Sequence, residues 1–152
     1  MVERTLILVK PDAMQRGLGG EVLSRFERRG LKLVALRMLQ MDRTLAAKHY
    51  AEHIGKAFYK PLVSFITSGP IIAALFEAEN AVELARQTIG ATDPAKSAPG
   101  SIRGDLGIDL GRNVVHGSDS PESAVREAAL FFDEKDVVEW QRSVEGWIVE
   151  KK

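Results

Sequence analysis

The sequence predicts an α/β protein of the α+β kind, in which helices cover one antiparallel four-stranded sheet with the ferredoxin-like order βαββαβ. Short apolar runs alternate with segments of helical spacing along the chain, in that order and with extra helices. Glycine and proline mark the boundaries between these segments. The 152 residues are enough for one core, so we expect a single domain over residues 1–152.

The first third of the chain alternates between strand and helix patterns. Arg4 to Val9 is an almost continuous apolar run, typical of a strand buried on both faces. Pro11 ends it, because proline cannot donate a ladder hydrogen bond. Glu21 to Arg29 has helical spacing and Gly30 suits its end. Leu31 to Met41 then alternates apolar with basic residues, which predicts a second strand.

The middle of the chain predicts three helices and one strand. Asp42 suits the N-cap of a helix that runs to about Gly55, and a short helix is expected over Pro61 to Thr67. Ile71 to Phe76 is an apolar run that predicts the third strand. Ala81 to Ile89 follows it with helical spacing.

The last third begins with a segment of a different kind. Gly90 to Gly111 is rich in glycine, proline and serine without sustained periodicity, and loops of this length are usually functional. Asn113 to His116 predicts a short fourth strand, and Ser120 to Leu130 a helix with proline in its first turn. Trp140 and Trp147 carry large apolar surfaces, so we expect the tail to pack.

Composition excludes several classes of function. The chain has no cysteine, which excludes disulfides, thiolate metal sites and a catalytic thiol. Basic and acidic residues number 21 each, a balance that argues against nucleic-acid binding, although a local basic cluster is still able to bind a polyanion. No signal peptide or run of roughly 18 apolar residues is visible. We therefore expect a cytoplasmic protein that binds neither nucleic acid nor membrane.

Two of the three histidines lie four residues apart on a predicted helix. His49 and His53 flank Glu52, so both rings would share one face, as in zinc-binding HExxH helices. The order of residues is wrong for that motif and no third ligand is evident. We interpret this face as solvated and assign no protein ligand to a metal.

His116 is different, because it ends an apolar strand and precedes the small polar run Gly117 to Pro121. A ligand would have space there, and the next helix presents its N-terminus, which favours phosphate. The usual phosphate-binding motifs GxxxxGK[ST] and GxGxxG are absent. These residues by themselves leave a structural and a chemical role for His116 open.

The segment NVVHGSDSPESA around His116 closely resembles the active-site signature of nucleoside diphosphate kinases. Four further segments resemble the family in the right order, so the resemblance covers essentially the whole chain: ERTLILVKPDA, FITSGP, GATDPAKSAPGSIRGD and REAALFF. It implies transfer of the γ-phosphate of a nucleoside triphosphate, mainly ATP, to nucleoside diphosphates. It also implies a ping-pong mechanism through a phosphohistidine on His116, which maintains the NTP and dNTP pools.

The resemblance also implies a role for each matching residue. His116 matches the nucleophile that takes the phosphate on Nδ1, and Glu127 the carboxylate that holds the other ring nitrogen. Ser118 matches a neighbour that hydrogen-bonds the glutamate, and Tyr50 a residue beside the histidine. The groups that match the family's phosphate-binding residues are Lys10, Arg86, Thr92 and Arg103.

The rest of the nucleotide is assigned by the same resemblance. Asn113 matches the contact to the sugar hydroxyl, and Phe58 the aromatic ring on which the base stacks. Mg²⁺ is implied with the nucleotide, bridging its phosphates. Two places depart from the family pattern: Ala57 replaces the usual proline before the aromatic, and the segment Glu77 to Asn80 lacks the glycine that usually follows the glutamate. The long tail resembles that of hexameric members, which implies a hexamer built from dimers.

Two alternative functions compete with this interpretation. A catalytically silent family member is disfavoured because every matching catalytic position is intact. A sheet that binds RNA, common among βαββαβ domains, is disfavoured by the zero net charge and the scarcity of aromatic residues. Labelling with γ-labelled ATP distinguishes all three.

Overall fold

The computed structural model describes residues 2–150, and its centre is one antiparallel sheet in the strand order β2-β3-β1-β4. The strands are β1 (Val2–Val9), β2 (Lys32–Gln40), β3 (Pro70–Glu79) and β4 (Val115–Gly117). β1 pairs with both β3 and β4, and β2 pairs with β3 across a register shift between Leu33 and Ala35. The predicted fold class is confirmed.

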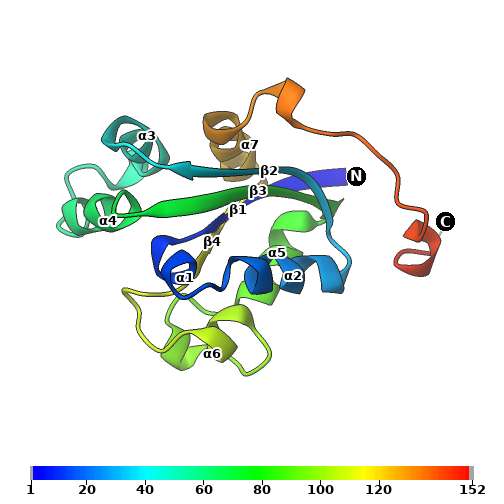
Figure 1. Cartoon of the computed structure of the whole chain (residues 1–152), viewed down its shortest axis with the longest axis horizontal. Helices are drawn as coiled ribbons and strands as arrows, with labels where there is room; N and C mark the ends of the chain where they lie inside the picture. The colour runs from blue at the N-terminus through cyan, green and yellow to red at the C-terminus, as the bar shows by residue number, and fades with distance from the viewer. Residues whose placement is uncertain (1, 151–152) are drawn as a thin grey trace.

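Helices cover both faces of this sheet (Figure 1). One face carries α3 (Arg43–His49), α4 (Tyr59–Ile66) and α7 (Pro121–Phe131). The opposite face carries α1 (Pro11–Gln15), α2 (Gly19–Arg29), α5 (Ala81–Ile89) and α6 (Ile102–Leu106). Four short 3-10 helices complete the chain: Ala51–His53, Pro94–Lys96, Glu134–Asp136 and Glu145–Trp147. No helix among residues 2–150 is long and apolar enough to cross a bilayer.

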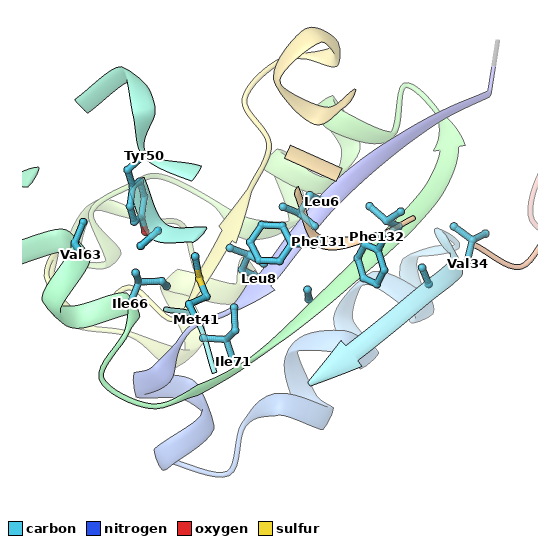
Figure 2. Packing of buried hydrophobic residues seen from close by; sticks show 14 residues of the cluster. Leu6, Leu8, Val34, Met41, Tyr50, Val63, Ile66, Ile71, Phe131 and Phe132 are labelled. Atoms are coloured by element: carbon cyan, nitrogen blue, oxygen red, sulfur yellow. The ribbon is translucent and has the colours of Figure 1, made fainter. Parts of the chain in front are cut away.

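The alternating side chains of β1 divide the core into two clusters. Leu6 and Leu8 pack with Phe131 of α7 and with residues of α3 and α4, as Figure 2 shows. Ile7 and Val9 point the other way, toward α2 and α5, where the rings of Phe26 and Phe76 lie 5.1 Å apart. Burial of each large apolar side chain contributes about 1.5–3 kcal/mol, so both faces hold β1 in place. β1 is therefore a rigid base for what its end carries.

Several element boundaries follow the local chemistry predicted from the sequence. Gly30 ends α2 in the left-handed conformation, at φ 115°. Asp42 caps α3 by accepting from Leu45 N, and Ser120 caps α7 by accepting from Ser123 N. α5 begins and ends where it was predicted.

Four expectations need correction. Pro11 does not only end β1 but starts α1, because its missing N–H is harmless at a helix N-terminus. The helix after Asp42 does not reach Gly55, since it ends at His49 and a 3-10 turn follows. The loop 90–111 contains α6 and a 3-10 turn. Trp147 does not pack within the chain and is 91% exposed.

Trp140 is an intermediate case in the same tail. Its ring is half exposed, but its indole Nε1 donates to Leu33 O, 3.0 Å away. Val138 N likewise donates to Val34 O, so this part of the tail runs beside the start of β2 (Figure 1). Further along the tail, Arg142 Nη1 donates to Gly30 O at 2.8 Å, so the expected packing of the tail is confirmed for Trp140 and wrong for Trp147.

Candidate active site

β4 brings His116 to the end of the sheet, opposite Leu8 of β1. Lys10 follows β1 directly, and its backbone N–H donates to Val114 O at 3.0 Å. Because β1 is held on both faces, this pairing fixes the histidine and the lysine relative to each other. Two segments more than a hundred residues apart in sequence thereby form one site.

A buried carboxylate holds one nitrogen of the His116 ring. Nε2 lies 3.0 Å from Glu127 Oε1, and the Ser118 hydroxyl donates to the same oxygen at 2.9 Å. Ser118 Oγ also accepts from Leu6 N, so it is itself anchored to β1. α7 delivers Glu127 because it folds back over the strand end from its cap at Ser120.

Glu127 is ionised although it is buried. Burial acts to raise its pKa, but the hydrogen bond and charge of His116 act against burial, with smaller contributions from His49 and Ser118, and the net pKa is lowered. An ionised carboxylate only accepts hydrogen bonds, so Nε2 carries the ring proton. The remaining ring nitrogen, Nδ1, is then the one with a free lone pair.

A second cluster joins three segments beside the histidine. Lys10 Nζ donates to Asn113 Oδ1 at 2.7 Å, and Arg103 donates through Nε to Asn113 O at 3.0 Å and through Nη2 to Val115 O at 2.6 Å. Asn113 Nδ2 in turn donates to Thr92 O. The segments that carry Lys10, Thr92, Arg103 and Asn113 therefore meet here.

Both cations of this cluster are partly stripped of water. Burial, followed by the charge of Arg103, lowers the pKa of Lys10 to about 8. Burial, followed by the charge of Arg86, lowers the pKa of Arg103 to about 10. Both side chains are predominantly charged at neutral pH, and neither forms an ion pair with another described residue, although the charge of Asp12 acts to raise both pKa values. An anion that entered the cluster would be bound strongly.

Arg86 joins the cluster from α5. Its Nη1 lies 3.5 Å from Gly117 O, at the outer limit of a hydrogen bond, and its charge acts on Arg103. Thr92 contacts this cluster through its backbone carbonyl, which accepts from Asn113 Nδ2. No contact of its side-chain hydroxyl with the other predicted phosphate-binding groups is among those described.

Asp12 was not singled out from the sequence, but it shapes the turn before His116. Val114 adopts φ 76°, a left-handed conformation that a β-branched residue rarely takes. Asp12 Oδ2 accepts from Val114 N at 3.0 Å and so holds this turn. The clue in the sequence was an acidic residue two positions after Lys10.

His49 is the second missed residue, and the expectation of a solvated face is wrong for it. Its side chain is buried, with a relative exposure of 4%, because α3 packs this face against α7. Its ring lies edge-on to that of His116, with centroids 4.8 Å apart. Burial, followed by the charge of His116, lowers the pKa of His49 to about 3, so the ring is neutral. A histidine directly before Tyr50 was the only clue.

A row of aromatic rings connects His116 with Phe58. Tyr50 lies 4.7 Å from His49 and 6.2 Å from His53, and His53 lies 5.1 Å from Phe58, measured between ring centroids. Phe58 is 51% exposed, and Lys56 Nζ lies 5.8 Å from its centroid. Its ring therefore belongs to the surface and not to the core, at the opposite end of the row from His116.

Fold and site together define a class of protein. The fold is an α+β domain with one antiparallel sheet. The site is a histidine fixed by a carboxylate next to a cluster of buried cations, and the class is that of a phosphate-transferring enzyme.

Comparisons with known proteins give the family. The family model for nucleoside diphosphate kinase matches residues 3–137. The nucleoside diphosphate kinase of Archaeoglobus fulgidus is 54% identical over 151 residues, which cover 99% of this chain and 100% of that one. One from Dehalococcoides mccartyi is 62% identical over 141 residues, covering 93% and 99%.

Solved structures agree with the sequence comparisons. A halophilic nucleoside diphosphate kinase from Halobacterium salinarum, in complex with CDP, superposes with a TM-score of 0.95 at 49% identity. It covers 99% of this chain and 100% of that one. The chain belongs to the nucleoside diphosphate kinase family and is an enzyme of that family, a kinase.

Proposed function

We propose that the protein transfers the γ-phosphate of a nucleoside triphosphate, mainly ATP, to nucleoside diphosphates by a ping-pong mechanism through His116. The carrying observation is the hydrogen bond between Nε2 and Glu127, which leaves Nδ1 as the nucleophilic nitrogen. In the first half, a bond forms from Nδ1 to the γ-phosphorus while the bond to the bridging oxygen breaks, and the diphosphate leaves. In the second half, a terminal oxygen of another diphosphate takes the phosphoryl group back from Nδ1.

Glu127 and Ser118 act on the ring and not on the phosphate. As Nδ1 gains the phosphoryl group, positive charge builds on the imidazole, and the ionised carboxylate at Nε2 stabilises it. Ser118 holds the carboxylate oxygen in line. Tyr50 packs beside the catalytic pair through His49.

The cationic cluster binds the phosphates. Lys10, Arg86 and Arg103 supply the charge that stabilises the spread negative charge of a phosphoryl group in transfer, and the Thr92 hydroxyl completes the set. Asn113 contacts the sugar hydroxyl. Because the donors are already held by β1, β4 and α6, little reorganisation is needed on binding.

Phe58 stacks on the nucleobase. Its exposed ring supports this role, since stacking uses the face common to every base and so accepts purines and pyrimidines alike. The CDP bound by the Halobacterium relative is a pyrimidine nucleotide. A site with this tolerance suits an enzyme that maintains all NTP and dNTP pools.

Mg²⁺ enters with the nucleotide. The residues fit a metal carried in this way, because the carboxylate whose charge acts on Lys10 and Arg103, Asp12, already accepts from Val114 N, and Glu127 is engaged by His116 and Ser118. When bound, the ion would neutralise part of the negative charge of the phosphates. No residue of this chain is assigned to it.

The protein assembles in the cytoplasm, where the nucleotide pools are, as a hexamer built from dimers. Exposed apolar side chains on β2 and in the tail, among them Met38 and Trp147, support assembly. Light scattering of the purified chain tests the number of subunits, and a tetramer would contradict it.

Brief incubation with γ-labelled ATP tests the mechanism. We expect a label on the protein that survives alkali and is lost in acid, since phosphohistidine behaves in this way and a serine ester does not. His116→Ala should abolish labelling with the fold intact, whereas His53→Ala should keep it. If the His116→Ala variant is still labelled, His116 is not the residue that accepts the phosphate. Phosphate transfer from ATP to GDP and to dTDP tests the breadth of substrates.

A further inference from the structure

His49, His116 and Glu127 form a cluster with the composition of a zinc site. Each offers one ligand atom, and these three atoms all lie within 4.8 Å of one another. Two imidazoles and one glutamate are a common protein ligand set for zinc, with a fourth position left to water. The proposed reaction uses His116 and Glu127 but assigns no chemistry to His49.

His49 is an unusual buried group even apart from this cluster. It is more than nine-tenths buried, and neither ring nitrogen has a hydrogen-bond partner among the described residues. A buried polar atom without a partner costs free energy and asks for an explanation. The ring lies edge-on to His116 and is confined by Tyr50 and Phe131. It is therefore held beside the catalytic pair, ready to coordinate.

The distances suit a small tetrahedral ion. Zinc–nitrogen and zinc–oxygen bonds of about 2.0–2.1 Å place neighbouring ligand atoms roughly 3.3 Å apart. Nε2 of His116 and Oε1 of Glu127 are already 3.0 Å apart. The widest separation of 4.8 Å closes with a shift of roughly 1.5 Å, within reach of a ring rotation. Arg126 Nη2 lies 3.7 Å from the other oxygen of Glu127, Oε2, so the ion takes the place of the His116 proton on Oε1, which keeps its hydrogen bond from Ser118.

We propose that His49, His116 and Glu127 together bind one zinc ion and that bound zinc inhibits phosphoryl transfer; the second part rests on the proposed function. The ion replaces the proton on His116 Nε2, which is released to solvent, and takes water as its fourth ligand. Zinc draws electron density from the His116 ring and separates this ring from Glu127, so His116 Nδ1 becomes a poorer nucleophile. Zinc competes with the Nε2 proton, not with the nucleotide.

Direct binding is the first test, on the purified full chain freed of nucleotide and metal. Zinc is titrated against a chromophoric chelator, and Co²⁺ serves as a spectroscopic probe because tetrahedral Co²⁺ absorbs visible light much more strongly than the hydrated ion. We compare the wild type with His49→Phe, which fills the same space, and with His53→Phe as the matched control on the next turn.

Wild type and His53→Phe should bind one ion per chain with a tetrahedral cobalt spectrum. His49→Phe should bind at least ~10-fold more weakly, as expected when a ligand is lost. If His49→Phe is poorly folded by circular dichroism, Glu127→Gln serves instead in this binding assay. Absence of binding to the wild type, or equal binding to His49→Phe, overturns the proposal.

Inhibition is the second test, measured as exchange between ATP and GDP with Mg²⁺ in excess and zinc buffered. Wild type and His53→Phe should lose activity as the site fills and regain it with a chelator. His49→Phe should keep its own zinc-free rate at the same zinc concentration. Inhibition that is equal in His49→Phe, or zinc binding without inhibition, overturns the proposal. Failure of the proposed function appears separately, as absent exchange without zinc.

Discussion

At the scale of single residues, the important property of Glu127 is the negative charge that it places next to His116. A buried carboxylate is costly, and it stays ionised here because His116 and Ser118 donate to it. In the proposed mechanism the imidazole gains positive charge during transfer, and the charge of Glu127 then becomes more favourable. The position therefore acts on the transition state more than on substrate binding.

Glu127→Gln should keep the shape of the site but lose this charge. We expect kcat to fall by about 10- to 100-fold, because a hydrogen bond to a charged group contributes about 1.5–3 kcal/mol, with little change in KM. Single-turnover phosphorylation by ATP measures the step. A change in KM with an unaltered kcat would show that Glu127 serves binding instead.

Lys10 gives a prediction for pH. Because its pKa is about 8, the Lys10 side chain of the free enzyme is mainly protonated below pH 8 and loses its positive charge as the pH rises above that value. We expect kcat/KM to fall with rising pH from about pH 8, because the uncharged amine holds phosphate poorly. Lys10→Arg should lower kcat/KM at neutral pH, since its geometry differs, but should lack this alkaline decline. The same decline in both proteins would assign it to another group.

At the scale of elements, two short segments position the residues of the proposed active site. The first turn of α7 fixes the helix that carries Glu127, and Ser120 accepts there from Ser123 N at 3.1 Å. Ser120→Ala should lower the free energy of unfolding by about 1 kcal/mol. Denaturant unfolding measures it, with Ser123→Ala as the control, since only the backbone of Ser123 takes part. Equal losses in both variants would contradict a capping role.

The turn before β4 is the other such segment. Asp12 satisfies Val114 N–H in a left-handed turn, so Asp12→Ala should leave that group unpaired at a cost of about 1–3 kcal/mol. His116 would also be less well fixed, which should lower kcat. Asp12→Asn keeps an acceptor at this place and should lose much less in both measurements. Similar losses in the two variants would show that the charge and not the turn matters.

At the scale of the whole molecule, the apolar side chains that remain exposed on the surface are candidate contacts between subunits. β2 is an outermost strand of the sheet, and its Leu36 and Met38 are 51% and 64% exposed. Unpaired strand edges with apolar side chains favour association. Met38→Lys should shift the light-scattering mass toward smaller assemblies, whereas Lys60→Ala, an exposed change on α4, should not. An unchanged mass in Met38→Lys would exclude this edge as a contact.

The elements differ in how far the sequence predicted them. Caps such as Asp42 and Ser120, and the stop at Gly30, were predicted because each depends on atoms within a few residues. The end of α3 at His49 was not, since the chain turns there to bury Tyr50 in the core, which no local pattern records. His49 was taken as solvated for the same reason, because α7 covers it from almost eighty residues away.

The sequence by itself determined the order of the four strands and of the helices other than α1 and α6, and the family resemblance that predicts His116 as the central residue. Tertiary structure decided which groups meet: His49 beside His116, Asp12 on the Val114 turn, and Lys10 with Arg103 around Asn113. The physical reason is the separation along the sequence over which each interaction acts. Capping and periodicity act within a few residues, whereas burial and the pKa values that follow from it depend on the pairing of β1 with β3 and β4.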